Sequence, residues 1–185
     1  MLLACGAVAA AATPPLPRTG SPALWATIDA CSPAGRADEI GVRGSMPGTG
    51  DRDEQLYMEF LVEYRDVHGN WQRMPGGESS FIQLGDGAAR SRQGGLNFTV
   101  APRSGVPYVV RGVVVFEWRV GARTVFSTVR STTAGHTAAA GADPPGYSAS
   151  LCAIAAKRRG SLVITPVTPS AASRAISARS STVHA

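Results

Sequence analysis

The chain has 185 residues, of which 44% are hydrophobic and 17% charged, enough for one domain of ordinary size with its own core. Its formal net charge of +5 comes from Lys157, Arg158, Arg159, Arg174 and Arg179, because the 13 arginines before them balance the 13 acidic residues. A nucleic-acid-binding domain carries its basic residues on the folded part, so this distribution argues against nucleic acid as a partner.

The first 13 residues, MLLACGAVAAAAT, form an apolar run that ends in small residues, and a Pro-rich leader follows over residues 14–23. Such a run is typical of a secretory signal peptide, and it is shorter than the roughly 20 apolar residues that span a bilayer. We interpret residues 1–13 as the remnant of a signal peptide whose start codon lies upstream. We therefore expect an exported protein without a transmembrane span. In an alternative interpretation, LLACG is a lipoprotein box and a lipid on Cys5 anchors the protein at the cell surface.

Behind the leader, short stretches of alternating apolar and polar residues are separated by turn signals, and none has a helical period. Strands are predicted over residues 24–31, 39–46, 55–66, 71–74, 80–84, 96–100 and 148–154, together with a hairpin over 109–132. Polar loops are predicted over residues 47–54 and 85–95. This pattern predicts an all-β fold, a single antiparallel β-sandwich of about seven to eight strands over residues 24–154. Residues 155–185 are rich in Ser, Ala and Arg and are predicted to be a disordered basic tail.

The hairpin over residues 109–132 is the strongest pattern in the chain. A glycine opens its two-residue turn at positions 121–122, as a type II′ turn requires. A direct register from this turn pairs Trp118 with Val125. It would place Val125 and Val129 on the core face and would send Phe126 and Arg130 outward, whereas a one-residue slip would turn Arg130 toward the core.

The chain has three cysteines. If Cys5 is removed with the signal peptide, Cys31 and Cys152 remain as an even pair in an exported protein, and we predict a disulfide between them. This bond would tie the two ends of the domain together. In the chain-entropy model a loop of roughly 120 residues contributes about 4–5 kcal/mol.

The order of Cys31, the long strand over residues 55–66, the segment VVRGVVVFEWRV and the closing SASLC resembles a secreted immunoglobulin- or fibronectin-III-like domain. More specifically, the chain is similar to exported proteins of GC-rich actinobacterial genomes with a WATIDAC-like start and an AGADPPGYSASLC-like end. The resemblance implies an Ig-like fold and export, and it implies no established activity. The chain differs from antibody domains because its cysteine pair lies at the ends of the domain and not on two central strands.

Signals for chemistry are sparse. The three histidines are spread over the chain, and neither a zinc-ligand spacing, nor a Gly-x-Ser-x-Gly motif, nor a phosphate-binding loop occurs. We therefore expect no metal and no cofactor. The acidic group Asp51, Asp53 and Glu54 lacks the later ligands of a calcium loop and is interpreted as a solvated loop.

The favoured function is a non-catalytic binding or structural module of the bacterial cell envelope or extracellular space. We expect a monomer whose partner is a cell-wall glycan or another envelope protein. Its candidate binding surface is a set of outward aromatic residues: Trp25, Tyr57, Trp71 and Phe126. Alternatively, Trp25 and Trp71 cap the edges of the core. The competing hypothesis is a small secreted hydrolase or carbohydrate-active enzyme with a site in the loops 47–54 and 85–95.

Overall fold

The computed structural model describes residues 19–100 and 106–155, and this part of the chain contains strands and no helix. The predicted signal peptide remnant, Cys5, the leader up to residue 18 and the tail from residue 156 lie outside the described residues. The nine strands are β1 (Trp25–Cys31), β2 (Glu39–Pro47), β3 (Glu54–Arg65), β4 (Trp71–Glu78), β5 (Ile82–Asp86), β6 (Ser91–Thr99), β7 (Tyr108–Val120), β8 (Arg123–Ser131) and β9 (Cys152–Ile154).

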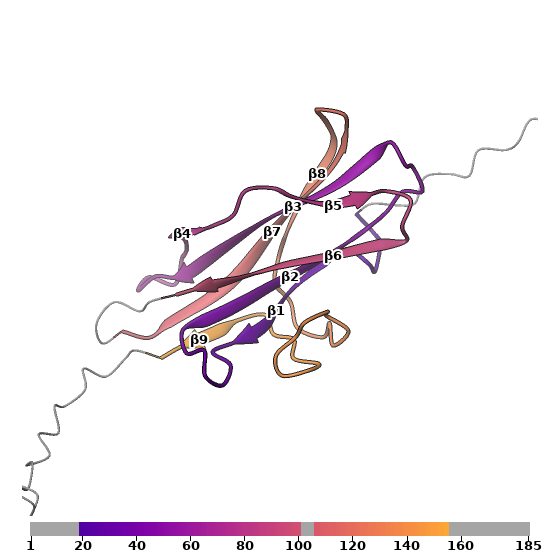
Figure 1. Cartoon of the computed structure of the whole chain (residues 1–185). Coiled ribbons are helices and arrows are strands. Elements are labelled where there is room, and N and C mark those ends of the chain that lie inside the picture. The colour runs from indigo at the N-terminus through magenta and orange to yellow at the C-terminus, as the bar shows by residue number, and fades with distance from the viewer. Residues whose placement is uncertain (1–18, 101–105, 156–185) are drawn as a thin grey trace, which may run out of the picture.

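The strands form two antiparallel sheets that pack face to face, which confirms the predicted β-sandwich (Figure 1). The first sheet has the order β1-β2-β6. In the second sheet β3 and β7 lie at the centre. The two short strands β4 and β5 pair with successive parts of β3, and β8 and β9 pair with successive parts of β7.

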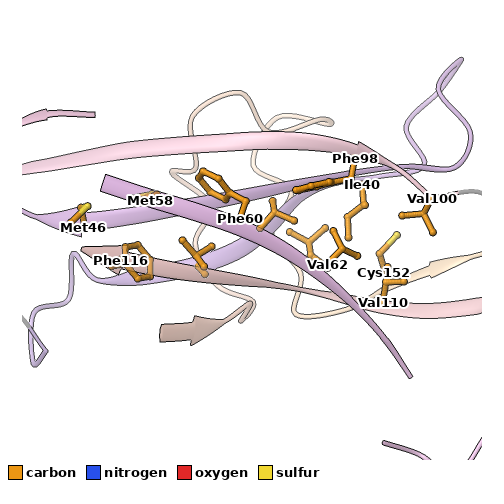
Figure 2. Close-up of a cluster of buried hydrophobic side chains, with 14 of the residues drawn as sticks. Ile40, Met46, Met58, Phe60, Val62, Phe98, Val100, Val110, Phe116 and Cys152 are labelled. Carbon is orange, nitrogen blue, oxygen red and sulfur yellow. The ribbon is translucent and has the colours of Figure 1, made fainter. Parts of the chain in front are cut away.

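The core lies between the sheets and is built mainly on the β3–β7 pair. These strands pair continuously from Glu54 opposite Val120 to Tyr64 opposite Val110. Alternate residues of β3 point inward and are fully buried, as the sequence pattern predicts: Leu56, Met58, Phe60 and Val62. Figure 2 shows Met58, Phe60 and Val62 meeting Ile40 and Met46 of β2 and Phe116 of β7. The buried Trp118 also donates its indole N–H to the Pro47 carbonyl, 3.1 Å away.

The predicted register of the hairpin is wrong beyond its first two pairs. A β-bulge leaves Val125 as an extra residue, so that Trp118 pairs with Phe126. Phe126 therefore turns inward and packs against Trp118, with ring centroids 5.5 Å apart. Val129 points outward and is 52% exposed, while Arg130 lies opposite the buried Val114 on the inward side.

The inward Arg130 is half-buried, and its polar group is satisfied. Its guanidinium donates to the carbonyls of Thr19 and Val129 and to the hydroxyl of Thr128. The bulge thus buries a large aromatic ring in exchange for an arginine that keeps its hydrogen bonds. Direct counting from the turn misses this outcome because it assumes an unbroken ladder.

Two stretches that were predicted as a loop or a break belong to strands. β6 begins at Ser91, inside the predicted loop 85–95, and β4 continues through Pro75. Gly94 and Gly95 fit this strand because an added Cβ on either would lie 2.7 Å from a side-chain atom of Leu84 or Arg43. Pro75 is tolerated because β4 is the terminal strand of its sheet order, where a missing amide donor breaks no ladder.

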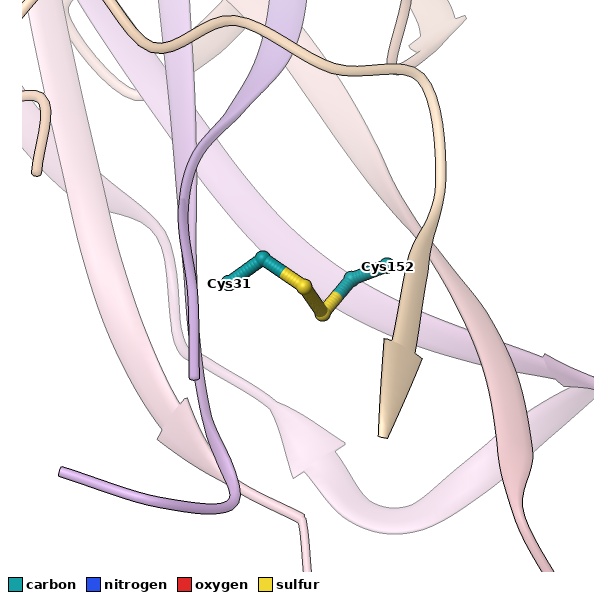
Figure 3. The surroundings of a disulfide bond; sticks show 2 residues. All are labelled: Cys31 and Cys152. Carbon is teal, nitrogen blue, oxygen red and sulfur yellow. A yellow bond between two sulfur atoms is a disulfide. The ribbon is translucent and has the colours of Figure 1, made fainter. Parts of the chain in front are cut away.

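The predicted disulfide between Cys31 and Cys152 is present, with a Cα–Cα distance of 5.6 Å (Figure 3). Cys31 ends β1 in the first sheet, and Cys152 opens β9 in the second. The bond therefore joins the two sheets at one end of the sandwich.

The long connection between β8 and β9, residues 132–151, packs along β1, and we call it the covering loop (Figure 1). Backbone hydrogen bonds fasten it to the edge of β1 at three places: between Ala149 and Ile28, from Thr133 to Ala26 and from Asp143 to Asp29. This edge of the sheet is thereby protected from pairing with another chain.

The covering loop also closes much of the outer face of the first sheet. His136 stacks on Trp25, Gly141 lies beside the Arg43 guanidinium, and the Gln93 side chain accepts from the amide of Ala140. As a result, polar side chains that point away from the core are nevertheless buried, among them Thr27 and Asp29. The sequence predicted only a stretch of small residues and prolines here.

Candidate functional site

The outer face of the second sheet keeps solvent-accessible side chains, and we call it the open face. It is defined by Tyr57 and Glu59 of β3, Val115 of β7, and Ser127 and Val129 of β8, all partly or fully exposed. Register places Glu59 beside Val115 and Val115 beside Val129, so these three side chains form one row across three strands.

At one end of the open face an arginine contacts two aromatic rings. The Arg119 guanidinium carbon lies 4.2 Å from the ring centre of Tyr57 and 4.5 Å from that of Phe81. Its Nε and Nη2 donate to Glu117 at 2.7 and 2.6 Å, and Thr124 donates to the same carboxylate. The charge of Arg119 is therefore neutralised within the domain, and its stacking fixes both rings.

The other end of the open face repeats this arrangement with different residues. Arg111 lies 4.3 Å from the ring centre of Trp71 and pairs with Glu63 at 2.7 Å. Both arginines come from β7, where positions 111 and 119 point to the same side. Sequence reasoning identified Tyr57 and Trp71 but missed these arginines. The signal was available, because Arg111, Glu117 and Arg119 share one alternating face of the strand.

The four predicted surface aromatics do not form one patch. Tyr57 and Trp71 lie on the second sheet near opposite ends of β3. Phe126 points inward against Trp118. Trp25 belongs to the first sheet, where its ring stacks on His136 at 4.6 Å between centroids and 11° between planes. Burial of His136 at this contact lowers its pKa below the ordinary value of 6.5.

A buried ion pair lies beneath the covering loop, and sequence reasoning missed it as well. Arg43 donates its Nε to Asp29 Oδ2 at 2.8 Å, and Asp29 is 2% exposed. Its other oxygen, Oδ1, has no hydrogen-bond partner and sits against Gly41, where an added Cβ would lie 2.3 Å away. Asp29 is the only charged residue of β1, and this is the sequence signal that could have identified the position.

The loops proposed for an enzyme site do lie side by side, and they are fastened to each other. Gly50 donates to the Gly87 carbonyl at 2.8 Å, and Gly87 donates to that of Glu54 at 2.7 Å. A Cβ on Gly48 would lie 1.9 Å from the Ala89 carbonyl oxygen, so the two backbones are in direct contact there.

His68 is remote from these loops. It lies in the turn after β3, at the other end of a strand whose 12 residues span about 35 Å. In this turn the Asp66 carboxylate accepts backbone amides of Asn70 and His68, which lowers the pKa of Asp66. Within residues 19–100 and 106–155, no three or more His, Cys, Asp or Glu side chains gather where they would hold a metal ion.

The same described residues contain no helix long and apolar enough to cross a membrane. Comparison with models of known protein families finds no match, and comparison with curated proteins finds no significantly similar sequence.

Proposed function

We propose that the chain is an exported, non-catalytic β-sandwich module of the bacterial cell envelope or extracellular space, and that it holds its partner on the open face. The disulfide supports export, because such bonds persist in oxidising compartments outside the cytosol. We choose the open face as the docking surface because the two outer faces of the sandwich differ in accessibility. The covering loop closes much of one face, and the other presents partly exposed apolar and aromatic side chains.

The strand order supports the proposed resemblance to immunoglobulin-like domains. The first sheet, β1-β2-β6, corresponds to strands A, B and E of that fold. The second sheet corresponds to C′, C, F and G, with β3 as C and β7 as F. The loops at the ends and the faces of such sandwiches serve many unrelated binding functions, so the fold alone does not name the ligand.

Two features of β8 support a monomer. This strand is the terminal one in the order β4-β3-β7-β8, and terminal strands invite pairing between copies. It carries a bulge at Val125 and the inward Arg130, and both devices oppose such pairing.

The open face can be tested with one variant and one matched control. Val129→Arg adds a charge at a half-exposed position of the open face, while Val67→Arg adds it in the turn after β3, where Val67 is 92% exposed. We expect the wild type and Val67→Arg to co-sediment with cell-wall or envelope fractions, and Val129→Arg to lose at least about tenfold in affinity. Equal binding of all three proteins would contradict the open face as the docking surface.

Export is tested separately by fractionation and non-reducing mass spectrometry of the full chain. We expect the protein outside the cytosol with Cys31 linked to Cys152. Cytosolic protein with two free thiols would contradict the export part of the proposal.

A further inference from the structure

We propose that the partner of the open face is a polypeptide segment with a basic side chain flanked by apolar ones, and that Glu59 receives its cation. This inference rests on the proposed function and adds the chemistry of the partner to it. It starts from the charges of the second sheet's outer face.

Most charged side chains of this face are already paired with one another. The pairs are Arg111 with Glu63 at 2.7 Å, Arg119 with Glu117 at 2.6 Å and Arg73 with Glu78 at 3.7 Å. Glu59 is the exception, because within the described residues its carboxylate makes neither a hydrogen bond nor an ion pair. The face therefore presents one carboxylate that is not neutralised.

The surroundings of Glu59 favour a cation beside this carboxylate in a complex. It is partly buried on β3 between Tyr57 and Leu61, and it faces Val115 across the strand pair. Val115 in turn faces the exposed Val129. When a partner covers these apolar neighbours and displaces water, the local dielectric constant falls, so an opposite charge beside Glu59 is attracted more strongly than at an open surface.

The two arginines of β7 that point to this face are poorly placed to neutralise Glu59. Its partner position on β7, Val115, lies midway between Arg111 and Arg119, four residues or about 13 Å from each. Each of these guanidinium groups is held on an aromatic ring by its own glutamate. Moving either one would break a stacked ion pair, so neither of these two arginines is a favourable source of a cation for Glu59, and we assign that role to the partner.

The row Glu59–Val115–Val129 favours a polypeptide over a sugar. In an extended segment, residues two positions apart share a face and lie about 7 Å apart. A basic residue and an apolar residue at that spacing can contact Glu59 and the valines together. A neutral glycan would leave Glu59 without a cation, and the rings of Tyr57 and Trp71 that would stack on sugars are already in contact with guanidinium groups.

The test uses the full chain and synthetic peptides of sequence Thr-Val-Thr-X-Thr-Val-Thr, in which X is Lys, Gln or Glu. Binding is followed by NMR chemical-shift changes of the ¹⁵N-labelled protein. We expect the Lys peptide to bind about tenfold more tightly than the Gln peptide, with shifts centred on β3, β7 and β8. The preference should weaken when NaCl is raised from about 0.05 M to about 0.5 M.

Glu59→Gln should abolish the preference for Lys. Glu78→Gln is the matched control, because Glu78 is 62% exposed in the same sheet and only loosely paired, and it should keep the preference. Thermal melts of both variants show that they are folded. Equal binding of the Lys and Gln peptides, a preference that survives Glu59→Gln, or shifts centred on the covering loop would each overturn the inference.

The two proposals fail in different ways. If Val129→Arg abolishes binding to envelope fractions but the wild type shows no preference for Lys, the docking surface stands and the role of Glu59 is overturned. If the full chain binds no envelope fraction, the proposed function fails whatever the peptides do.

Discussion

The Cys31–Cys152 bond offers the sharpest quantitative test of how this domain is stabilised. It joins residues 121 positions apart. In the chain-entropy model a closed loop of this length raises the free energy of unfolding by about 5 kcal/mol at 25 °C. A domain of about 140 residues unfolds with an entropy near 0.3 kcal/mol/K, so loss of the bond should lower the Tm by about 15–20 °C.

Three samples distinguish the stabilisation by the disulfide bond from that by the packing of its sulfur atoms. They are the oxidised protein, the protein reduced with dithiothreitol, and the variant Cys31→Ala/Cys152→Ala. Cys152 is fully buried, so the double variant also loses some packing. We expect the reduced protein to melt about 15–20 °C below the oxidised one, and the double variant to melt slightly lower still. Circular dichroism and calorimetry give the melting temperatures.

A reduced protein that melts within about 3 °C of the oxidised one would refute the reasoning. Kinetics provides a second check, because the model places the effect of the bond in the unfolded chain. Reduction should slow refolding and leave the unfolding rate nearly unchanged. If reduction lowers the stability mainly by speeding unfolding, the bond acts on the native state instead.

Three other substitutions address the core, the covered ion pair and the covering loop. Gly112→Ala should lower the free energy of unfolding by about 1–3 kcal/mol, because its Cβ would lie 2.6 Å from Val42. In urea unfolding, a double-mutant cycle with Val42→Ala should show that the two losses of stability are less than additive. Arg43→Met should lower the free energy of unfolding by about 3–5 kcal/mol, because it leaves the buried Asp29 carboxylate without its cation. Adding Asp29→Asn to this variant should recover part of the lost stability, and equal stability of Arg43→Met and the wild type would contradict the estimate. Because burial lowers the pKa of His136 in the folded state, the unfolded chain takes up this proton first as pH falls, so stability should drop as pH decreases through 6.5 and level off below the folded pKa. Thermal melts between about pH 7.5 and pH 5 should show this fall in stability in the wild type but not in His136→Gln.

Much of the sandwich could be predicted from local alternation. The inward and outward residues of β3 follow the sequence pattern because one face of the strand is buried in a core and the other is not. The cysteine count and the expectation of export predicted the disulfide correctly. Glycine and proline were less reliable guides, since Gly94, Gly95 and Pro75 all lie within strands. Their places depend on neighbouring side chains and on which strand is terminal, and neither is a local property.

The candidate site could be predicted only in part. Tyr57 was correctly placed on the outer side of β3, while Phe126 was not, because a single extra residue in β8 reverses every side chain beyond it. The arginines that stack on Tyr57 and Trp71 come from a strand distant in sequence. Their shared face on β7 is visible in the sequence, but the rings that they contact become known only from the register between β3 and β7.

The positions of most strands, the buried faces of β3 and β7 and the cysteine pair could be read from local sequence, because they depend on alternation, turn chemistry and the number of thiols. Which outer face remains accessible could be seen only from the folded arrangement of the chain. That choice depends on contacts such as Ile28 with Ala149, which join residues about 120 positions apart. Within the described residues, the absence of an ion pair at Glu59 likewise depends on which side chains the paired strands β3, β7 and β8 bring together, and not on the order of residues in any one of them.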